Sequence, residues 1–485
     1  MKYITGNYEI DRDVLRSDFK DCSDFLLREV KVSGERALLL AMDGLVDSLT
    51  LTRSFTSPVL ESKLSFSSPV EHFEKIKACV AAAPEMNETT EFEELEFFLM
   101  SGFAGFILED CPRALVLGVQ GWNKRSTDEP TNEAMVKGAK ECFTETINDN
   151  KALLRKRLKS PDLKLRQLKL GDFCDTPVVI AYIKGRAEPR IVIRIEKQLE
   201  SAPLDAVQDY GSLNAFLEDK TRSPFSTVGN TERPDVLASK LLEGRVGIMT
   251  DGTPFVMYLP YLFTDSFSSL DDYDNPPFYA GFVRLLKYLS FTLSIFLPAF
   301  YVAIGSYHQE MIPAPLLYLI ASGEEATPFP LAVEAVLIHI LYEIMREAGL
   351  RLPRTVGHAV SIIGAIVIGE AMVSAGIISE PMLVVVALTA IASYAVYPLY
   401  ESVAVLRIAF IVLAGITGIY AIVIGGCALI VNACSLSSCG VPFTAPLTPL
   451  TPTSLGDTLT RQSWRTLARR RVRISKLKGA DGSNE

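Results

Sequence analysis

The chain has 485 residues and a formal net charge of −9, and this length excludes a single compact domain. Its charge is unevenly distributed: residues 1–285 are mixed and charged, residues 288–433 are overwhelmingly apolar, and residues 461–478 hold eight Lys or Arg and no acid. The net charge of the whole chain is therefore an average over three parts that differ in composition. We expect these parts to be a soluble region, a membrane region and a basic tail.

The first 135 residues (1–135) are predicted to form an α/β subdomain. The N-terminal sequence MKYITGNYEIDRD has no apolar segment typical of a secretory signal, so we expect this region to stay in the cytosol. Its expected elements, in chain order, are a helix over 10–30, a strand over 37–42, a helix ending at 100, and strands over 103–108 and 114–119.

The same pattern recurs further along the chain. The sequence LMSGFAGFILEDCPRALVL at 99–117 resembles LLEGRVGIMTDGTPFVMYL at 241–259, with Leu, Gly and Pro matching at a constant offset of 142. Upstream, ALLLAMDG at 37–44 resembles VVIAYIKG at 178–185 at an offset of 141. Unrelated hairpins also share Gly and Pro at their turns, but the near-constant offset favours duplication. We predict a second α/β subdomain at residues 171–285.

Residues 136–170, between the two copies, are predicted to be a basic helical linker. Acidic side chains such as Glu141 and Glu145 come early and basic ones such as Lys156 and Arg157 come late, which suits the helix dipole. The basic end could also meet anionic lipid head groups, and a solvated linker face is the simpler alternative.

A membrane domain with four to six membrane segments is predicted at residues 286–433. Its apolar runs are 288–305, 327–345, 356–378, 381–397 and 405–431. The Lys and Arg of the flanking loops favour a cytosolic start, but five full crossings would place the basic C-terminal segment, 434–485, outside. We therefore expect at least one run, either 327–345 or the first one with its Pro298, to be re-entrant, interfacial or not a true span.

The third apolar run is rich in small residues and carries a carboxylate near its centre. Glu370 lies well away from the small-residue face, and a mid-membrane carboxylate costs ~2.5–3.5 kcal/mol. We expect Glu370 to line a water or ion path, to pair with a neighbouring helix, or to escape to the interface. The small-residue face, which allows close helix packing, comprises Gly357, Ser361, Gly364, Ile368, Ala371 and Ala375.

Three further polar candidates within the apolar region are Glu334, His339 and Glu343. Such groups need protein partners or water because lipid offers neither. Their helix could line the vestibule of a pore or lie amphipathically on the membrane surface. The chain has no Walker loop, GxSxG or HExxH motif, and its cysteines are scattered, so we expect no catalytic residue, metal or cofactor.

Several segments resemble the A subunits of the GerA-type spore germinant receptors. The resemblance runs in order from about residue 90 to 452 and implies an α+β cytosolic region of two similar α/β subdomains, followed by an α-helical multi-span membrane domain in the spore inner membrane. The segments that carry it are NTERPD (230–235), LLEGRVGIMTDGTPF (241–255), REAGLRLPRTVG (346–357), SIIGAIVIGEAMVSAG (361–376) and SCGVPFTAPLTP (438–449).

The resemblance also implies partners and an activity. These are a permease-like B subunit, a lipoprotein C subunit, membrane lipids, a homo-oligomer that forms a nutrient-gated cation channel, and no nucleic acid. Two departures leave alternatives open: Glu370 stands where Gln is expected more often, and Ala139 resembles the stage V sporulation AF paralogue linked to dipicolinate release. A non-conducting interaction scaffold is a further alternative.

Overall fold

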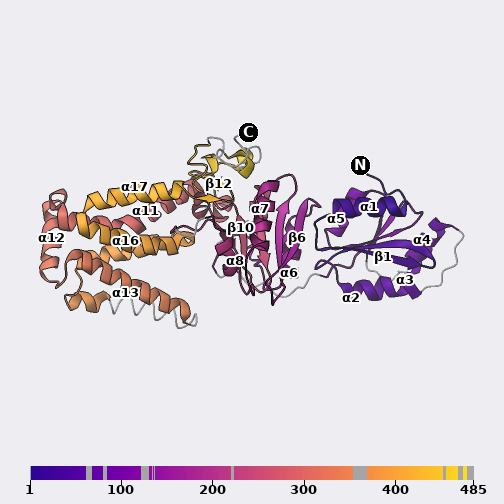
Figure 1. Cartoon of the computed structure of the whole chain (residues 1–485), viewed down its shortest axis with the longest axis horizontal. Coiled ribbons are helices and arrows are strands. Elements are labelled where there is room, and N and C mark those ends of the chain that lie inside the picture. The colour runs from indigo at the N-terminus through magenta and orange to yellow at the C-terminus, as the bar shows by residue number, and fades with distance from the viewer. Residues whose placement is uncertain are drawn as a thin grey trace.

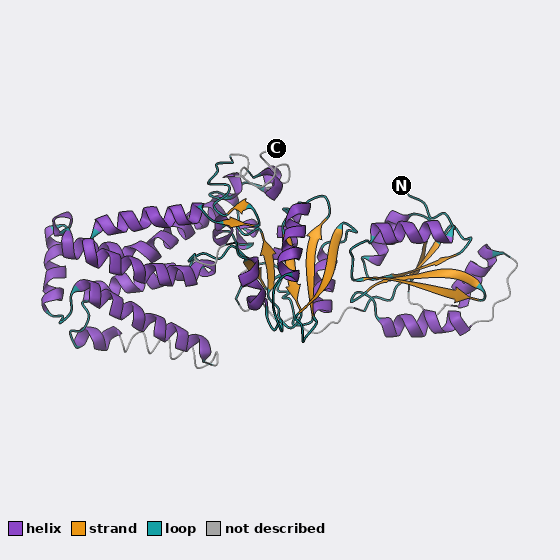
Figure 2. Ribbon diagram, viewed as in Figure 1, coloured by secondary structure: helices purple, strands orange, loops and turns teal. Residues whose placement is uncertain are grey.

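The computed structural model describes residues 2–61, 68–79, 85–121, 130, 132–133, 135, 137–219, 223–352, 369–451, 455–467 and 473–477. Three parts follow one another along the long axis: an N-terminal α/β subdomain, a second α/β subdomain and a bundle of helices (Figure 1). The described strands lie in the two subdomains and in a short C-terminal hairpin (Figure 2). A mixed α/β region followed by a helical region agrees with the prediction.

The first subdomain is a five-stranded antiparallel sheet with helices on both faces. Its strand order is β1-β2-β4-β5-β3. Neighbouring residues of the second strand, such as Leu39 and Leu40, belong to separate hydrophobic cores on the two faces. The elements are α1 (Tyr8–Asp18), β1 (Phe25–Val32), β2 (Glu35–Met42), α2 (Ser48–Leu51), the π-helical turn η1 (Thr52–Thr56), α3 (Ser57–Glu61), α4 (Pro69–Cys79), β3 (Met86–Thr89), α5 (Phe92–Leu99), β4 (Ala104–Leu108) and β5 (Ala114–Leu117).

The helix predicted over residues 10–30 is wrong in its second half. The helix begins after Asn7, whose side chain accepts hydrogen bonds from two backbone N–H groups of the first turn, and it ends at Asp18. The following segment, FLLREVKV, forms β1 instead, because a tight turn at Ser33 and Gly34 pairs all eight of its residues with β2. Long-range pairing therefore overrides a composition that also suits a helix.

The second subdomain repeats the first. Its strand order is β6-β7-β9-β10-β8, the same order of roles as in the first sheet. β9 and β10 each begin 142 residues after β4 and β5, so the predicted duplication is confirmed. The elements are α6 (Ile147–Arg157), β6 (Leu163–Leu170), β7 (Thr176–Ile183), α7 (Pro189–Glu200), α8 (Tyr210–Leu217), β8 (Gly229–Thr231), α9 (Pro234–Leu242), β9 (Val246–Thr250), β10 (Val256–Leu259) and the 3-10 turn η2 (Phe263–Phe267).

The linker predicted at 136–170 belongs largely to the second subdomain. β6 is the first strand of its sheet, and α6 takes the place that α1 has in the first copy. The side chains repeat as well: the buried Asp11 accepts from the backbone N–H of Thr5, and the buried Asn150 accepts from that of Thr144. A buried polar side chain thus closes the turn before the first helix in both copies.

The helical part contains long apolar elements. Two of its helices, Pro277–Tyr307 and the segment Tyr397–Thr417, are long and apolar enough to cross a membrane by length and composition. A helix over residues 369–374 precedes Gly376, and residues 353–368 lie outside the described part. The helices with printed bounds are α10 (Asp271–Asp274), α11 (Pro277–Tyr307), α12 (Ala314–Glu325), α13 (Leu331–Arg351), α15 (Glu380–Tyr394), α16 (Tyr400–Thr417) and α17 (Ile419–Cys434), with 3-10 turns η3 (Gln309–Met311) and η4 (Tyr397–Leu399).

The last apolar run, predicted as one segment over 405–431, is two helices. The chain turns at Gly418, which has a φ of +69°, and α17 packs back against α16. A Cβ at Gly418 would also lie 3.0 Å from the Cβ of Tyr307. Hydropathy does not reveal this break because the residues on both sides of Gly418 are apolar.

The chain continues past α17 onto the second subdomain. There it forms the short hairpin of β11 (Ser437–Ser438) and β12 (Val441–Pro442), and later the helix α18 (Trp464–Leu467), with 3-10 turns η5 (Leu455–Asp457) and η6 (Ile474–Lys476). The chain therefore enters the bundle through α11 and leaves it through α17 at the same end, the one next to the second subdomain (Figure 1).

Replacing Gly244 by Ala should destabilise the second subdomain. Gly244 has a φ of +94°, and a Cβ there would lie 2.6 Å from the carbonyl oxygen of Arg186. We expect a loss of about 1–3 kcal/mol in the free energy of unfolding. Thermal unfolding of the detergent-solubilised chain measures it, with Gly211→Ala as control because a Cβ there meets open space. Equal melting temperatures for the two variants would contradict the prediction.

Candidate functional site in the helical bundle and its junction

The small-residue face predicted for the third apolar run is only partly described. Gly357, Ser361, Gly364 and Ile368 lie outside the described residues, whereas Ala371 and Ala375 are exposed.

Glu370 is also exposed, and it forms no hydrogen bond or ion pair with another described residue. Its neighbour Gly369 is buried, and a Cβ there would lie 3.5 Å from Leu383 of α15. At this level the helix therefore packs through Gly369 and directs Glu370 away from α15.

Glu334 is fully buried at the start of α13. Its Oε1 accepts hydrogen bonds from the backbone N–H of Ser379 at 2.7 Å and from the Ser379 hydroxyl at 2.8 Å. Its Oε2 has no hydrogen-bond partner among the described residues. The contact between α13 and Ser379, the residue before α15, therefore buries a carboxylate inside the bundle. Burying a carboxylate oxygen without a hydrogen-bond partner costs free energy.

His339, one turn further along α13, is also fully buried. Its Nδ1 lies 2.7 Å from the backbone carbonyl oxygen of Ala335, so Nδ1 carries the proton and donates. Its Nε2 has no hydrogen-bond partner in the described part of the chain. The helix thus directs two buried polar groups, Glu334 and His339, into the interior of the bundle.

Glu343 is the acceptor of a polar cluster between α13 and α16. The Tyr400 hydroxyl donates to its carboxylate at 2.9 Å, and Arg346 Nε donates at 3.0 Å. Arg407 Nη1 completes the cluster at 3.6 Å. The guanidinium of Arg346 also lies over the Tyr400 ring, 4.0 Å from its centroid, a cation–π contact.

Arg407 ties three helices together. It is 1% exposed, its Nε donates to the backbone carbonyl oxygen of Ser294 in α11 at 2.9 Å, and it faces Glu343 of α13. This arginine is not among the site residues predicted from the sequence, although it lies near the start of the apolar run 405–431. A lone cation in an apolar run was the available signal, since it needs a buried acid as partner.

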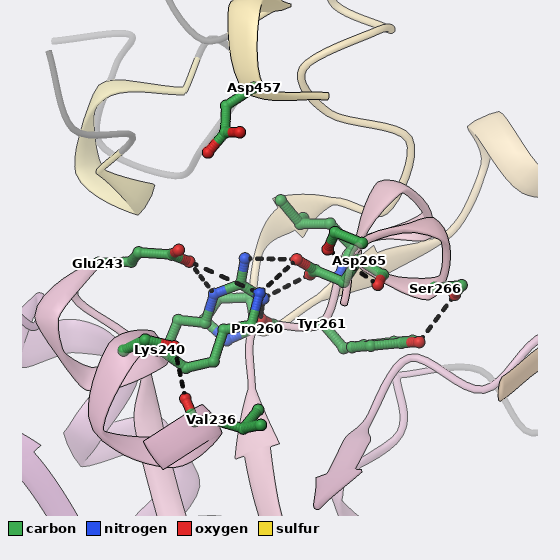
Figure 3. A network of polar contacts seen from close by, with 12 residues as sticks. Val236, Lys240, Glu243, Pro260, Tyr261, Asp265, Ser266 and Asp457 are labelled. Carbon is green, nitrogen blue, oxygen red and sulfur yellow. Dashed lines mark hydrogen bonds and ion pairs between the residues drawn. The ribbon is translucent and has the colours of Figure 1, made fainter. Parts of the chain in front are cut away.

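A second polar network lies in the second subdomain, next to the bundle. Asp265 in η2 accepts from Arg245 Nη1 at 2.5 Å, from Arg245 Nη2 at 3.0 Å and from Lys240 Nζ at 2.9 Å. Figure 3 shows Lys240, Glu243 and Asp265 converging at this point. Burial by itself would raise the pKa of Asp265, but the charges of Arg245 and Lys240 outweigh it and hold this pKa well below its usual range.

The turn that carries Asp265 packs directly on α11. The Phe267 ring stacks on Tyr288 with centroids 4.0 Å apart, and Phe263 meets Phe291 edge to face at 5.6 Å. Arg284, fully buried in the same helix, donates to Asp272 at 3.1 Å. The Arg245–Asp265 pair is therefore one contact away from the first helix of the bundle.

The C-terminal segment strengthens this junction. The backbone N–H of Phe263 donates to the carbonyl oxygen of Phe443 at 2.8 Å, and that of Ile474 donates to the carbonyl oxygen of Glu243 at 3.1 Å. Ile474 and Leu477 are buried in a hydrophobic core of the second subdomain. The part of the basic tail that is described is thus docked on the second subdomain.

The two subdomains are also joined by a buried ion pair. Arg155 of α6 donates from Nε and Nη2 to both oxygens of Asp24, each at 2.9 Å, and both residues are buried. Next to this pair, the backbone N–H of Leu165 donates to the carbonyl oxygen of Asp21 at 3.0 Å. Bidentate pairing of this kind fixes orientation as well as distance.

Two residues of the motif NTERPD (230–235), Thr231 and Glu232, contact the carboxyl or backbone of Glu133. Thr231 Oγ1 donates to Glu133 at 2.5 Å, and the backbone N–H of Glu133 donates to Glu232 at 2.9 Å. The pKa of Glu133 is raised to about 7, mainly by burial; the hydrogen bond from Thr231 opposes this rise and the nearby charge of Glu232 adds to it.

No group of three or more His, Cys, Asp or Glu arranged to hold a metal occurs in the described parts of the chain. The polar residues of the bundle and junction instead pair with one another or stand alone. Such an arrangement holds charged groups in fixed positions at the contact between the second subdomain and the helix bundle.

Raising the pH should lower the stability of the chain through Glu133. The folded state keeps this proton up to about pH 7, whereas the unfolded chain releases it near pH 4.5. The free energy of unfolding should therefore fall by about 1–3 kcal/mol as the pH rises from about 5 to about 8. Glu133→Gln should flatten this slope in thermal unfolding, and the exposed Glu145→Gln should leave it unchanged. An unaltered slope in Glu133→Gln would refute this assignment.

Breaking the junction pair should be costly. Arg245→Met leaves Asp265 buried with one cation fewer, and we expect a loss of about 3–5 kcal/mol in the free energy of unfolding. The double variant Arg245→Met with Asp265→Asn should lose less than the sum of the single losses. The exposed pair of Arg351 and Glu347 is the control, and Arg351→Met should cost less than about 1 kcal/mol. Strict additivity at Arg245 and Asp265 would argue against direct coupling.

Comparison with known proteins gives the chain its relatives. A family model described as Bacillus/Clostridium GerA spore germination protein matches residues 13–473. Spore germination protein KA of Bacillus subtilis (strain 168) is 38% identical over 94% of this chain and 84% of that protein. The uncharacterized membrane protein YfkQ of the same organism is 35% identical over 99% and 94%, and spore germination protein GerLA of Bacillus cereus is 30% identical over 92% and 91%.

A solved structure is also similar. The N-terminal domain of the A subunit of the Bacillus megaterium spore germinant receptor GerK3 is 28% identical, covers 54% of this chain and 98% of that chain, and has a TM-score of 0.43. The family match spans nearly the whole sequence, from the first helix to the docked tail. This chain therefore belongs to the GerA spore germination protein family.

Proposed function

We propose that the chain is the A-type membrane subunit of a spore germinant receptor that, as a homo-oligomer, forms a nutrient-gated cation channel in the spore inner membrane. The observation that carries this proposal is the placement of charge in the bundle. Glu334 and Arg407 are buried inside, while large apolar side chains such as Ile391 and Ile424 are exposed outside. That distribution suits a surrounding lipid, and inward ionisable groups in membrane proteins commonly mark ion pathways.

The attachment of both bundle ends supports a specific topology. α11 leaves the second subdomain and α17 returns to it, so a bundle that crosses the membrane does so an even number of times. The two subdomains and the basic tail then share the cytosolic side, which satisfies the positive-inside rule. The turn at Gly418 supplies the additional helix that the five predicted runs lacked.

Family membership supports the remaining parts of the proposal. We propose that the chain works with a permease-like B subunit and a lipoprotein C subunit, and that its role is conduction without enzymatic chemistry. The Arg155–Asp24 pair between the subdomains, and the turn that Arg245 holds through Asp265 and that packs on α11, would carry a movement from the subdomains to α11.

Cation flux tests the channel. The chain would be expressed with its B and C partners in membrane vesicles, and potassium release would be followed after addition of a mixture of amino acids, sugars and nucleosides. A unit charge about 10 Å from a permeating cation is worth about 1.7 kcal/mol at an effective dielectric constant of about 20, or about tenfold in rate. Glu343→Gln, which leaves Arg407 without its nearest acid, should therefore lower the flux about tenfold.

Two further variants sharpen this test. Glu347→Gln, on the same helix but half exposed, should leave the flux unchanged. Glu370→Gln tests the predicted path residue, and unchanged conductance and selectivity would remove Glu370 from the pore. A stable assembly that conducts no ions would overturn the channel and support a scaffold or an accessory protein of the stage V type.

A further inference from the structure

The first turns of α11 have their polarity reversed relative to a soluble helix. Phe278 is 94% exposed, and the outward face continues through other large apolar side chains, whereas Ala280 and Arg284 on the inward face are buried. In water such an arrangement would leave a large apolar surface uncovered. The exposed large apolar residues of this stretch are Phe278, Tyr279, Phe282, Leu285, Leu286 and Leu289.

This reversed stretch extends beyond the neighbouring helices. α11 and α16 end at the same level, since the Tyr307 hydroxyl donates to the carbonyl oxygen of Gly415 at 2.7 Å. With 31 and 18 residues, the two helices are about 46 Å and about 27 Å long. The start of α11 therefore reaches about 19 Å past the start of α16, toward the second subdomain. A bilayer core of about 30 Å cannot contain the whole length of α11.

The C-terminal helix α18 lies beside this stretch. Arg461 donates to the backbone carbonyl oxygens of Asn275 at 2.7 Å and Tyr273 at 3.0 Å, which holds the tail at the start of α11. Trp464 donates from Nε1 to the same Tyr273 carbonyl oxygen at 3.2 Å and is itself 58% exposed. An exposed tryptophan therefore joins the exposed aromatic side chains of α11.

The tail also supplies positive charge. Arg465, Arg473 and Lys476 are exposed, and none of them forms an ion pair with another described residue. Residues 461–478 contain no acid, although Asp274 is exposed near the start of α11. Aromatic and basic side chains thus occur together at the level where the bundle meets the second subdomain.

We propose that Phe278, Tyr279, Phe282, Trp464 and Arg465 form a collar that lies in the lipid head-group layer next to the second subdomain and binds anionic phospholipid. Tryptophan and tyrosine favour this layer, and unpaired basic side chains favour anionic lipid. A symmetric contact with a second copy fits less well, because it would bring the same unpaired cations together. This inference rests on the membrane crossing proposed above and moves the membrane boundary from Tyr288 back to about Phe278.

Fluorescence quenching by brominated lipids tests the collar. The full-length chain carrying Trp122→Phe, which leaves Trp464 as its single tryptophan, would be placed in nanodiscs of phosphatidylglycerol or phosphatidylcholine. Lipids brominated near the head group should quench Trp464 more strongly than lipids brominated deep in the acyl chain. Phosphatidylglycerol should quench it more than phosphatidylcholine, and Arg465→Gln should lower that preference about fivefold. Lys31→Gln, an exposed cation of the first subdomain, should not change it.

Two reporter tryptophans, each in a chain with both native tryptophans replaced by Phe, separate this inference from the proposed crossing. Val412→Trp, at an exposed position in α16, should be quenched best by deep bromines, and Phe97→Trp in the first subdomain should not be quenched. Quenching at position 412 without quenching of Trp464 would overturn the collar and leave the crossing intact. Absence of quenching at both positions would overturn both, and quenching of Trp464 without lipid preference would overturn its binding of anionic lipid.

Discussion

The ion pair between Arg245 and Asp265 is the contact on which the arrangement of the molecule depends. It is buried, it is supported by Lys240, and it sits in the turn that packs on α11. The turn thus connects this pair to the first helix of the bundle through the aromatic contacts of Phe267 and Phe263. A buried pair of this kind contributes little net stability relative to an apolar contact, but it is very sensitive to loss of either partner. It therefore specifies orientation, which a purely apolar contact would leave adjustable.

The second copy of the duplicated subdomain connects the first copy to the helical bundle. Two copies of one five-stranded fold are linked by the Arg155–Asp24 pair, and the second copy holds both the entry and the exit of the helical bundle. The contact between the two copies thus includes a buried charged pair. A change of orientation in the first copy would accordingly reach α11 through contacts that tolerate few alternative geometries.

The interior of the bundle follows the same principle. Arg407 contacts α11 through Ser294 and α13 through Glu343, so removing its charge affects three helices at once. Glu334 and His339 each retain an atom without a hydrogen-bond partner in the described chain, and such atoms are costly in an apolar setting. The bundle thus contains buried polar atoms that its described hydrogen bonds leave unsatisfied, and these atoms are part of the argument for the conduction proposed above.

The amino-acid sequence by itself determined the large divisions: two copies of an α/β unit, an apolar region, a basic tail and membership of one family. The first three properties are local or periodic, so spacing and composition reveal them, whereas the family follows from the resemblance of whole segments. Only the tertiary structure decided which polar groups meet. Glu343 faces Arg407, 64 positions later, and Glu334 faces Ser379, although Glu370 was the carboxylate that the sequence made most prominent. Pairing across helices depends on how helices far apart in the sequence pack together, which no local pattern records. The turn at Gly418 was hidden for a related reason: both sides of it are apolar, so hydropathy carries no signal there.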